Sequence, residues 1–371
     1  MHAARVLIVG GGIGGLTAAI ALRRRGFAVE VIEKDPDWTV YGVGIIQQSN
    51  VIRAMADLGL LEEYLGAAFG FDHVDVYLPD GRRAARVPSP KLVEGRPANL
   101  GVARPALHKV LGRRALREGA EVRLGVTATA LDDDGAGVTA RFSDGTEGRY
   151  ELVVGADGVF SRTRRTILPD APEPEFTGQS VWRYNLPRPA EVDCLRAYDG
   201  PTGVGLVPLS TDLMYIYVTT PEPGNPRYPR AGLAAAMRGK LKDAPPGIAE
   251  LAPRITDDEG VVYKPEDCLL LEGDWHRGRV VLLGDAVHAT TPHLGQGAGM
   301  AIEDGLVLAD ELSRAEAPEA AFRAYRDRRF ERCALTVRLS RAICDAQLGK
   351  GPPVDQAELT AQMFEVMARP I

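Results

Sequence analysis

The stretch Gly10-Gly11-Gly12-Ile13-Gly14-Gly15-Leu16 follows the short apolar run Val6–Val9. Gly10, Gly12 and Gly15 fit the spacing G-x-G-x-x-G. In this pattern the first glycine permits a tight turn, the second lets a pyrophosphate approach the backbone, and the third allows a helix to pack closely on a strand. The stretch therefore predicts a buried strand, a turn and a helix whose amino-terminal amides face a phosphate group.

A second strand and an acid complete this unit. Helix formers over 16–25 end at Gly26, and Ala28–Ile32 then reads as a strand that ends at Glu33. Glu33 lies 18 residues after Gly15, close to the offset of an acid that binds a ribose hydroxyl. A glutamate also disfavours a 2′-phosphate here, because like charges repel. The sequence thus predicts a Rossmann-type dinucleotide unit.

Two more turns of the same kind occur far along the chain. Gly155-Ala156-Asp157-Gly158 follows the apolar run Leu152–Val154, and Gly284-Asp285-Ala286-Val287-His288 follows Val280–Leu283. An acid beside a glycine after a strand can accept a hydrogen bond from a sugar hydroxyl while leaving room for a ligand. Three such turns at the beginning, middle and end of one chain favour a single long ligand, and FAD fits this better than a nicotinamide cofactor alone.

Composition sets the broad class. The chain has 371 residues, 45% apolar and 25% charged, with a net charge of −6, which argues for a globular protein and against a general nucleic-acid binder. We expect no secretory signal, and no apolar run approaches the ~20 residues of a membrane span. The four cysteines lack a CxxC pair, so we expect no metal site, no disulfide framework and a reducing cytoplasm (Cys194, Cys268, Cys333 and Cys344).

The three turns, extended to Gly155–Arg164 and Gly284–Pro292, resemble the FAD-dependent single-component aromatic hydroxylases, the group with p-hydroxybenzoate, salicylate and 6-hydroxynicotinate hydroxylases. The resemblance covers residues 5 to about 345. It implies an enzyme that hydroxylates a small aromatic or N-heteroaromatic, phenol-type substrate with NAD(P)H and O2 through a flavin C4a-hydroperoxide. No second dinucleotide fingerprint is present, which agrees with transient binding of NAD(P)H as a co-substrate.

The resemblance also implies a set of FAD contacts. It places Asp157 near the pyrophosphate, Asp285 on a ribityl hydroxyl, and Arg104 on phosphate or ribityl oxygens, and it turns the loop 292–299 toward the flavin pyrimidine. The alternatives without a ligand are that Asp157 or Asp285 only caps its turn, or that the Arg104 side chain is exposed to solvent. The complete expected cofactor set is Gly10, Gly12, Ile13, Gly14, Gly15, Glu33, Lys34, Gly44, Arg104, Asp157, Gly158, Gly284, Asp285, Pro292, Gly295, Gly297, Ala298 and Gly299.

The middle of the chain changes character and predicts a second layer. Strand-like segments alternate with turns over 179–262, with a hairpin formed by Val204–Leu209 and Leu213–Thr219. We therefore expect an α/β fold: a parallel-sheet FAD-binding domain (1–73, 99–175 and 265–348), an inserted antiparallel substrate domain (74–98 and 176–264), carboxy-terminal helices and a tail (349–371). The substrate pocket should lie where the second sheet covers the flavin ring.

Candidate substrate residues lie on two strands of this layer and on two loops. Alternation places Tyr215 and Tyr217 on one face, although two such tyrosines are equally common as packing. Trp182, Arg183 and Tyr184 are neighbours on another strand, and the loop Tyr41–Gln48 should pass the flavin. We predict His293, Tyr217 and Tyr215 as catalytic, and the following as substrate-binding: Gln47, Gln48, Arg183, Tyr215, Tyr217, Pro292 and His293. A structural role for His293 is equally compatible with its pattern.

Other readings stay open on the same scaffold. An epoxidase or a dehydrogenase shares these motifs, whereas a halogenase usually carries WxWxIP, and the tryptophans here are scattered (Trp38, Trp182 and Trp275). A non-catalytic FAD-binding protein is a further alternative. The segment 319–348 predicts a helix that packs on the FAD domain rather than on a membrane surface. We expect a monomer or homodimer without nucleic-acid or stable membrane partners; the substrate and the choice of NADH or NADPH stay open.

Overall fold

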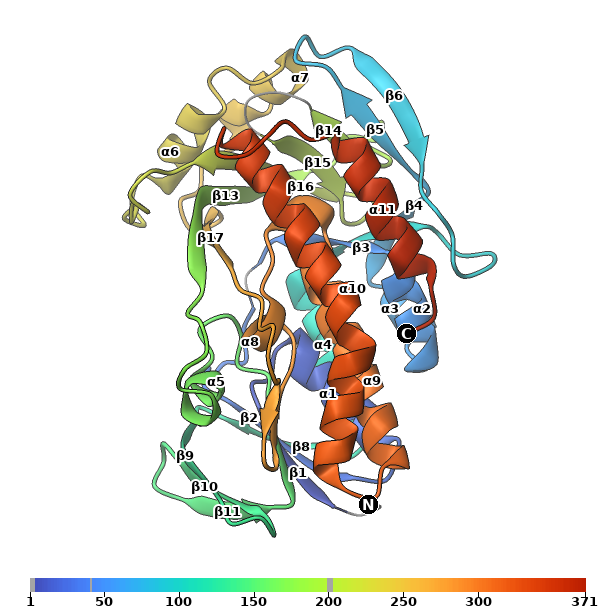
Figure 1. The fold of residues 1–371 in the computed structure, drawn as a ribbon. Coiled ribbons are helices and arrows are strands. Elements are labelled where there is room, and N and C mark those ends of the chain that lie inside the picture. Colours follow the sequence, from blue (N-terminus) through green and yellow to red (C-terminus); the bar gives the residue numbers. More distant parts are fainter. Residues whose placement is uncertain (1–3, 41, 199–202) are drawn as a thin grey trace.

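The computed structural model describes residues 4–40, 42–198 and 203–371, so Tyr41 lies outside the described residues. Two large sheets lie one above the other, and the long helix α10 (Pro318–Gln347) runs alongside both (Figure 1). The lower sheet carries the glycine-rich turns. The upper sheet closes over them, so the region between the two sheets is where a site formed by both must lie.

The lower sheet is six-stranded and mainly parallel. Its order is β18 (His276–Arg277), β19 (Val280–Leu282), β12 (Leu152–Gly155), β1 (Arg5–Val9), β2 (Ala28–Glu33) and β8 (Glu121–Leu124). β19, β12, β1 and β2 pair in parallel, with Val6 opposite Leu152 and Val29, and only β18 is antiparallel. Because parallel strands end at the same edge, the turns after β1, β12 and β19 lie side by side.

Helices cover this sheet closely. α1 (Ile13–Arg23) packs against α4 (Arg104–Arg117) and α9 (Gly297–Arg314), and α10 covers α9. A β-carbon on Gly305 would lie 2.7 Å from the backbone nitrogen of Ala18, so this glycine permits the close approach of α9 to α1. The apolar residues of β1, and those of α1 after Ile13, are buried in this core, as a sheet covered on both faces requires.

The upper sheet is seven-stranded and mostly antiparallel. Its order is β17 (Val262–Cys268), β13 (Glu175–Pro187), β16 (Leu213–Pro221), β15 (Val204–Pro208), β14 (Leu195–Tyr198), β5 (His73–Tyr77) and β6 (Arg83–Pro88). One face packs on α6 (Leu233–Lys240), α7 (Pro246–Ala249) and η1 (Ala252–Arg254) around a core that includes Trp182, Met214 and Met237. The other face turns toward the glycine-rich turns.

Smaller elements complete the fold. One three-stranded sheet contains β3 (Gly44–Gln48), β7 (Asn99–Ala103) and β4 (Ala68–Phe71), and another contains β9 (Ala128–Asp133), β10 (Val138–Phe142) and β11 (Glu147–Tyr150). The short helices are α2 (Ser49–Asp57), α3 (Leu61–Leu65), α5 (Arg162–Ile167), α8 (Asp285–His288), η2 (Pro292–Leu294) and the later α11 (Gln356–Ala368). Among the described helices we find none of the length and apolar character that crossing a bilayer demands.

The predicted fold class is confirmed: a parallel α/β sheet, an antiparallel sheet and carboxy-terminal helices. The predicted hairpin is β15–β16, and the predicted helix over 319–348 is α10. β5 and β6 belong to the same sheet as β13. The exact division of the chain into an FAD domain and a substrate domain stays a proposal.

Candidate active site

The first glycine-rich turn combines tight packing with one open position. A β-carbon on Gly10, whose φ is +112°, would lie 2.4 Å from the carbonyl oxygen of Ala156, and one on Gly15 would lie 2.0 Å from that of Gly10. By contrast, no atom lies within 4 Å of the position of a β-carbon on Gly12. Two glycines are therefore required by the fold itself, while the backbone at Gly12 faces space that a ligand can enter.

Two long helices begin at this region without side-chain caps. α1 starts after Gly12 and α9 starts after Gln296, and neither has an N-cap hydrogen bond from a side chain or an acid in its first turn. The first amides of a helix lack intrahelical acceptors and carry the positive end of the helix dipole. The predicted residues Ile13, Gly14 and Gly297–Gly299 lie at these two starts. Both are suited to anionic groups, such as a pyrophosphate and a reduced flavin ring.

Glu33 is held beside the same turn. Its Oε2 accepts a hydrogen bond from the backbone nitrogen of Gly11 at 2.8 Å, and its Oε1 accepts one from that of Asp35 at 2.9 Å. Each carboxylate oxygen keeps a further lone pair, which is what a ribose hydroxyl would need. Lys34, the next residue, is exposed. The geometry is compatible with the predicted role of Glu33.

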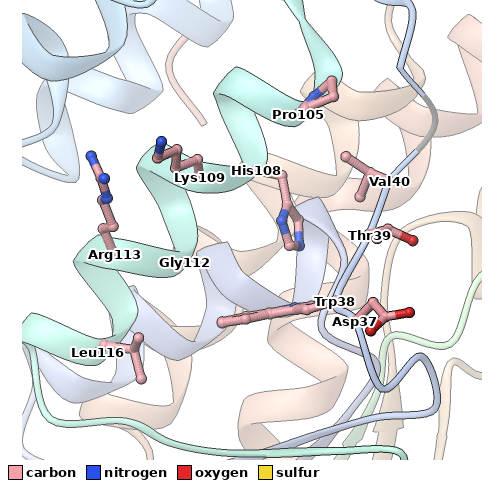
Figure 2. Close-up of a pocket in the computed structure, with 10 residues that line it drawn as sticks. All are labelled: Asp37, Trp38, Thr39, Val40, Pro105, His108, Lys109, Gly112, Arg113 and Leu116. Atoms are coloured by element: carbon pink, nitrogen blue, oxygen red, sulfur yellow. The ribbon is translucent and has the colours of Figure 1, made fainter.

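A recess of about 420 Å³ opens behind this turn (Figure 2). His108 projects from α4 toward Trp38, with the two ring centres 5.2 Å apart, and both side chains contact the carbonyl oxygen of Gly11. Lys109 and Arg113 add positive charge from the same helix. The recess is lined by Asp37, Trp38, Thr39, Val40, Pro105, His108, Lys109, Gly112, Arg113 and Leu116. Aromatic rings and cations beside the turn suit the nucleotide end of a dinucleotide.

Asp157 is engaged within its own turn. Its Oδ1 accepts a hydrogen bond from Ser161 Oγ at 2.5 Å, and its Oδ2 accepts hydrogen bonds from the backbone nitrogen and Oγ1 of Thr163 at 2.9 and 3.0 Å. These contacts order the start of α5. Gly158, with φ of +81°, has open space where a β-carbon would be. The geometry gives Asp157 the turn-capping role weighed above, and a direct contact with FAD stays a prediction.

Asp285 differs from Asp157 despite a similar sequence context. Its side chain is exposed, and no hydrogen bond to its carboxylate is found in the described part of the chain. Desolvation by the surrounding protein nevertheless raises the pKa of Asp285, against the opposing fields of His288, Arg104 and Lys264. We interpret this as a carboxylate with protein around it, flanked by positive charge and open to a ligand hydroxyl.

Four predicted residues come together beneath the upper sheet. Arg183 on β13 lies directly across from Tyr217 on β16, and a β-carbon on Gly205 would lie 2.4 Å from the Tyr217 ring. Tyr215 packs on Gly44, where a β-carbon would lie 2.6 Å from its ring. Gly44 therefore makes room for a tyrosine, and a direct contact between Gly44 and FAD stays a prediction.

The two tyrosines are held in their neutral form. Burial raises the pKa of Tyr215 to about 12 and raises that of Tyr217 further, although the charge of Arg183 opposes both shifts. The positive charge of Arg104 also opposes the rise in the pKa of both Tyr215 and Asp285. Arg104 is therefore close enough to influence both the substrate sheet and the expected cofactor side. A phenol with a raised pKa can donate a hydrogen bond at neutral pH but is a poor base. The predicted catalytic roles of Tyr215 and Tyr217 are therefore compatible with orienting a substrate.

Two aromatic candidates face the opposite side of the sheet. Trp182 packs against Tyr228 and Tyr263, and its Nε1 donates to Thr220 Oγ1 at 3.0 Å in the α6-side core. Tyr184 packs against the same core. The expectation that Trp182 and Tyr184 line the pocket with Arg183 is wrong, because neighbours on a strand point to opposite faces.

His293 is fixed by the protein on both ring nitrogens. Its Nδ1 lies 2.9 Å from Thr291 Oγ1 and its Nε2 lies 3.0 Å from Gln347 Oε1. Gln347 Oε1 also accepts from Gln179 Nε2, so Nε2 of His293 is assigned the proton. Burial lowers the pKa of His293 to about 4. This arrangement favours a neutral ring that holds the loop 292–295, while the catalytic role stays a prediction.

Gln47 and Gln48 lie on β3 beside this loop. Gln48 Nε2 donates to the carbonyl oxygen of Leu294 at 3.2 Å, and Gln48 Oε1 accepts from Gln296. Gln47 is fully buried and its Nε2 donates to the carbonyl oxygen of Ile46. Gln48 thus joins the strand to the loop that begins α9. Contacts of Gln47, Gln48 and Pro292 with substrate stay predictions.

One acid of this region was not predicted from the sequence. Glu266 on β17 is 5% exposed, lies near Arg183, and has ligand atoms within 4.8 Å of those of His293 and Cys344. Lys264, two residues earlier, acts on Asp285. The signal was the period of two between Lys264 and Glu266, with Pro265 marking an edge strand. The sequence analysis ended the strand layer at Val262 and so missed both.

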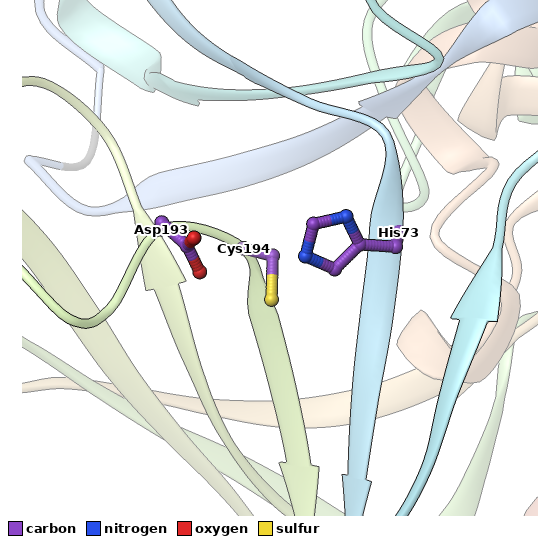
Figure 3. Close-up of side chains that lie close together, drawn as sticks. All are labelled: His73, Asp193 and Cys194. Atoms are coloured by element: carbon purple, nitrogen blue, oxygen red, sulfur yellow. The ribbon is translucent and has the colours of Figure 1, made fainter.

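Three clusters among the described residues bring together side chains that could ligate a metal. In the first, His73, Asp193 and Cys194 converge between β5 and β14 (Figure 3), but burial and Asp75 raise the pKa of the Cys194 thiol to about 12. Burial likewise raises the pKa of Cys344, beside Glu266, to about 12. In the third cluster, His288 is bound to Asp304. Binding of a metal at any of these clusters would release a proton from the thiol or the imidazole.

Comparisons with known proteins agree with this geometry. Residues 3–340 match the family described as FAD binding domain. The chain is 31% identical to 6-hydroxynicotinate 3-monooxygenase of Bordetella bronchiseptica, covering 91% of this chain and 90% of that protein. It is 32% identical to 3-hydroxybenzoate 6-hydroxylase of Polaromonas naphthalenivorans, covering 91% and 86%. The crystal structure of Klebsiella pneumoniae HpxO with FAD and uric acid superposes with a TM-score of 0.84 at 26% identity, covering 98% and 92%.

Proposed function

We propose that this chain, which belongs to the FAD binding domain family, is an FAD-dependent monooxygenase. Its substrate would be a small aromatic or N-heteroaromatic ring of the phenol type. NAD(P)H and O2 are the co-substrates. The observation that carries the proposal is the meeting of three parallel strand ends with two uncapped helix starts and the open carboxylate of Asp285. The substrate layer of Arg183, Tyr215 and Tyr217 faces this meeting point.

The chain's own residues divide the work of holding FAD. We assign the pyrophosphate to the start of α1 at Gly12, the ribose to Glu33, and a ribityl hydroxyl to Asp285 with Arg104 beside it. The start of α9 faces the pyrimidine side of the ring. The remaining assignments are the predicted cofactor residues Gly10, Ile13, Gly14, Gly15, Lys34, Gly44, Asp157, Gly158, Gly284, Pro292, Gly295, Gly297, Ala298 and Gly299.

The protein then supplies orientation and a dry site. When bound, FAD supplies hydride acceptance from NAD(P)H and activation of O2. The amides at Gly297 and Ala298 stabilise negative charge on the ring's pyrimidine side. Tyr217 and Arg183 orient the substrate ring, and the buried upper sheet keeps water away from it. His293 and Pro292 fix the loop against which the ring rests.

The proposal extends to the setting of the enzyme. The described cysteines are free, three of them buried, which fits a reducing compartment, and we place the protein in the cytoplasm. We propose a monomer or homodimer whose partners are the aromatic substrate, O2 and NAD(P)H. Nothing in the charge of the chain favours nucleic acid as a partner.

The test is a coupled assay on purified protein. We expect the protein to retain FAD with its yellow colour and to consume NAD(P)H and O2 together only with an aromatic substrate. Hydroxylated product should appear in near-equal amount to NAD(P)H oxidised, for at least one member of a panel of hydroxybenzoates, hydroxypyridines and larger phenols. A colourless protein that takes up no added FAD would disprove the proposal. Consumption of NAD(P)H without O2 would indicate a dehydrogenase instead.

A further inference from the structure

Glu266 is buried without satisfying its carboxyl group. It is 5% exposed, and neither Oε1 nor Oε2 has a hydrogen-bond partner among the described residues. Burying a carboxyl in this way is costly, and native structures avoid it unless the group has another use. The upper sheet does satisfy another buried acid: Glu222 accepts hydrogen bonds from Thr220, Tyr228 and Lys240 at 2.7–2.8 Å. The orphan state of Glu266 is therefore specific to its position.

The backbone around Glu266 is irregular in a way that directs its side chain. Asp267 pairs with Phe176 and Pro265 pairs with Ser180, so the three residues 177–179 of β13 lie opposite the single residue Glu266. Within this bulge Gly178 has φ of +98°, which a side chain would strain. Bulges bend a strand and re-aim side chains, and they are frequent beside active sites.

The groups that face Glu266 leave it available. Arg183 on β13 acts on it electrostatically but donates it no hydrogen bond. His293 on η2 uses both ring nitrogens elsewhere, and the thiol of Cys344 on α10 lies 3.5 Å from Gln179 Oε1. Lys264 on the same strand acts on Asp285 and Asp267. A ligand is the partner that this arrangement lacks.

We propose that Glu266 selects the substrate, and that it selects an aromatic ring whose edge carries an N–H or O–H hydrogen-bond donor, such as a ring N–H, an amine or a second hydroxyl. The inference rests on the proposed function, because the ring must lie between Arg183, Tyr217 and the loop of His293. A carboxyl oxygen with no internal donor accepts such a hydrogen bond, and a ring lacking the donor leaves it unpaired. A buried acceptor left unpaired penalises the wrong ligand strongly.

The protonation state of Glu266 supports the proposed selection of donor-bearing rings. It also provides a second test, the pH dependence of binding. Burial raises the pKa of Glu266 to about 8, opposed by the charge of Arg183. Raising the pH through 8 ionises the carboxyl and strengthens its bond to a donor. The same ionisation repels a ring that carries a carboxylate at that edge. Donor-bearing and carboxylate-bearing rings should therefore respond to pH in opposite directions.

Binding to the FAD-loaded protein tests the inference with three rings: 4-aminophenol, 4-fluorotoluene as its donor-free counterpart of similar shape, and 4-hydroxybenzoate. Equilibrium dialysis gives each Kd for the wild type, Glu266→Gln and Glu266→Leu. We expect Glu266→Leu to weaken 4-aminophenol about tenfold and to leave 4-fluorotoluene unchanged or tighter, since one lost hydrogen bond to a buried group is worth about this factor. Glu266→Gln, which keeps an acceptor, should recover part of the loss.

Stability provides a readout independent of activity. Removing an unpaired buried carboxyl should raise the Tm of Glu266→Leu by about 2 °C or more. The matched control Glu222→Leu removes a carboxylate that has hydrogen-bond partners. It should lower the Tm and leave the preference among the three ring compounds unchanged. Equal binding of 4-aminophenol by the wild type and Glu266→Leu would overturn the inference. So would weaker binding of 4-hydroxybenzoate by Glu266→Leu than by the wild type at a pH above 8, where Glu266 is ionised. Failure to hold FAD would instead overturn the proposed function.

Discussion

The buried carboxylates of the α9–α10 interface and the buried carboxyl of Glu266 in the upper sheet have opposite surroundings. In the α9–α10 charge network (His288, Glu303, Asp304, Arg329 and Arg332), Arg329 binds Glu303 at 2.6 Å and Asp304 at 2.8 Å. Glu266 is also buried, at 5% exposed against 0% for Glu303 and Asp304, but it has no hydrogen bond among the described residues. A buried carboxyl thus has either several partners, which stabilise the scaffold, or none, which leaves it available to a ligand.

The charge network also reaches the predicted cofactor side. Asn50 Nδ2 donates to Glu303 Oε1 at 2.9 Å and to Gln296 Oε1 at 3.1 Å, and Gln296 is the residue before α9. Gly284 donates its backbone N–H to Asp304 Oδ2 at 2.9 Å. The network therefore fixes two of the turns that we assign to FAD, whereas Glu266 is fixed by nothing but its strand.

The largest expected effect comes from removing one cation of the network. Arg329→Met should lower the free energy of unfolding by about 3–5 kcal/mol, because it removes the cation shared by two buried carboxylates and leaves Arg332 on Glu303 and His288 on Asp304. Urea unfolding followed by circular dichroism measures this. Arg338→Met is the matched control: Arg338 pairs with Glu272 at the surface, where a pair contributes about 0–1 kcal/mol. Similar losses for both variants would contradict the comparison.

A smaller effect separates the two motif aspartates. Asp285→Asn should weaken FAD binding about tenfold or more, because a charged acceptor contributes about 1.5–3 kcal/mol to a hydrogen bond. Asp157→Asn should instead lower folding stability by about 1 kcal/mol, since it weakens the turn at α5. Titration of deflavinated protein with FAD and thermal unfolding provide the two measurements. Equal loss of FAD affinity in both variants would show that Asp157 contacts FAD directly, as Asp285 is proposed to do.

The smallest expected effect is a pH dependence of opposite sign in the two groups. Burial raises the pKa of Glu266 from 4.5 to about 8, so the folded state holds a proton that the unfolded state releases. Stability should then fall as the pH rises from 4.5 through 8, and Glu266→Gln should gain about 1 kcal/mol or more over the wild type across this range. Urea unfolding at several pH values measures the difference.

Asp304 provides the contrast. Burial alone would raise its pKa, but His288 and Arg329 outweigh this and hold it at about 2. Its contribution to stability is therefore complete above pH 3.8 and is lost as the pH falls through 2. The difference in the free energy of unfolding between the wild type and Glu266→Gln should change between pH 5 and 8. If it does not change, Glu266 is solvated or paired in solution.

The sequence predicted what is local and repeated, and missed what depends on distant partners. β1, α1 and β2 are each encoded in a continuous pattern, and the glycine-rich turns predicted a parallel sheet, but the order β19, β12, β1 came from the structure. Asp157 and Asp285 look alike in sequence, yet only Asp157 is followed by Ser161 and Thr163 in a geometry that satisfies it. The difference exists only in three dimensions.

Glu266 shows the same limit more strongly. Its surroundings come from residues 179 and 183 on β13, from His293 and from Cys344, and the bulge opposite it has no sequence signature beyond Gly178. Which face of β13 turns inward was also undetermined from the sequence, because Arg183 and the aromatic residues beside it are all plausible pocket residues. Pairing with β16 resolves this, since Tyr217 lies directly opposite Arg183.

The indole of Trp38 has a practical consequence for spectroscopy. Trp38 adopts a φ of 49° and donates its Nε1 hydrogen to the carbonyl oxygen of Gly11, whereas Trp182 and Trp275 are completely enclosed in apolar cores. Of the three tryptophan side chains, Trp38 is therefore the one that contacts the first glycine-rich turn. Its fluorescence should respond to occupancy of that turn, so the protein carries a built-in optical probe for the nucleotide half of its cofactor, separate from the colour of the flavin half.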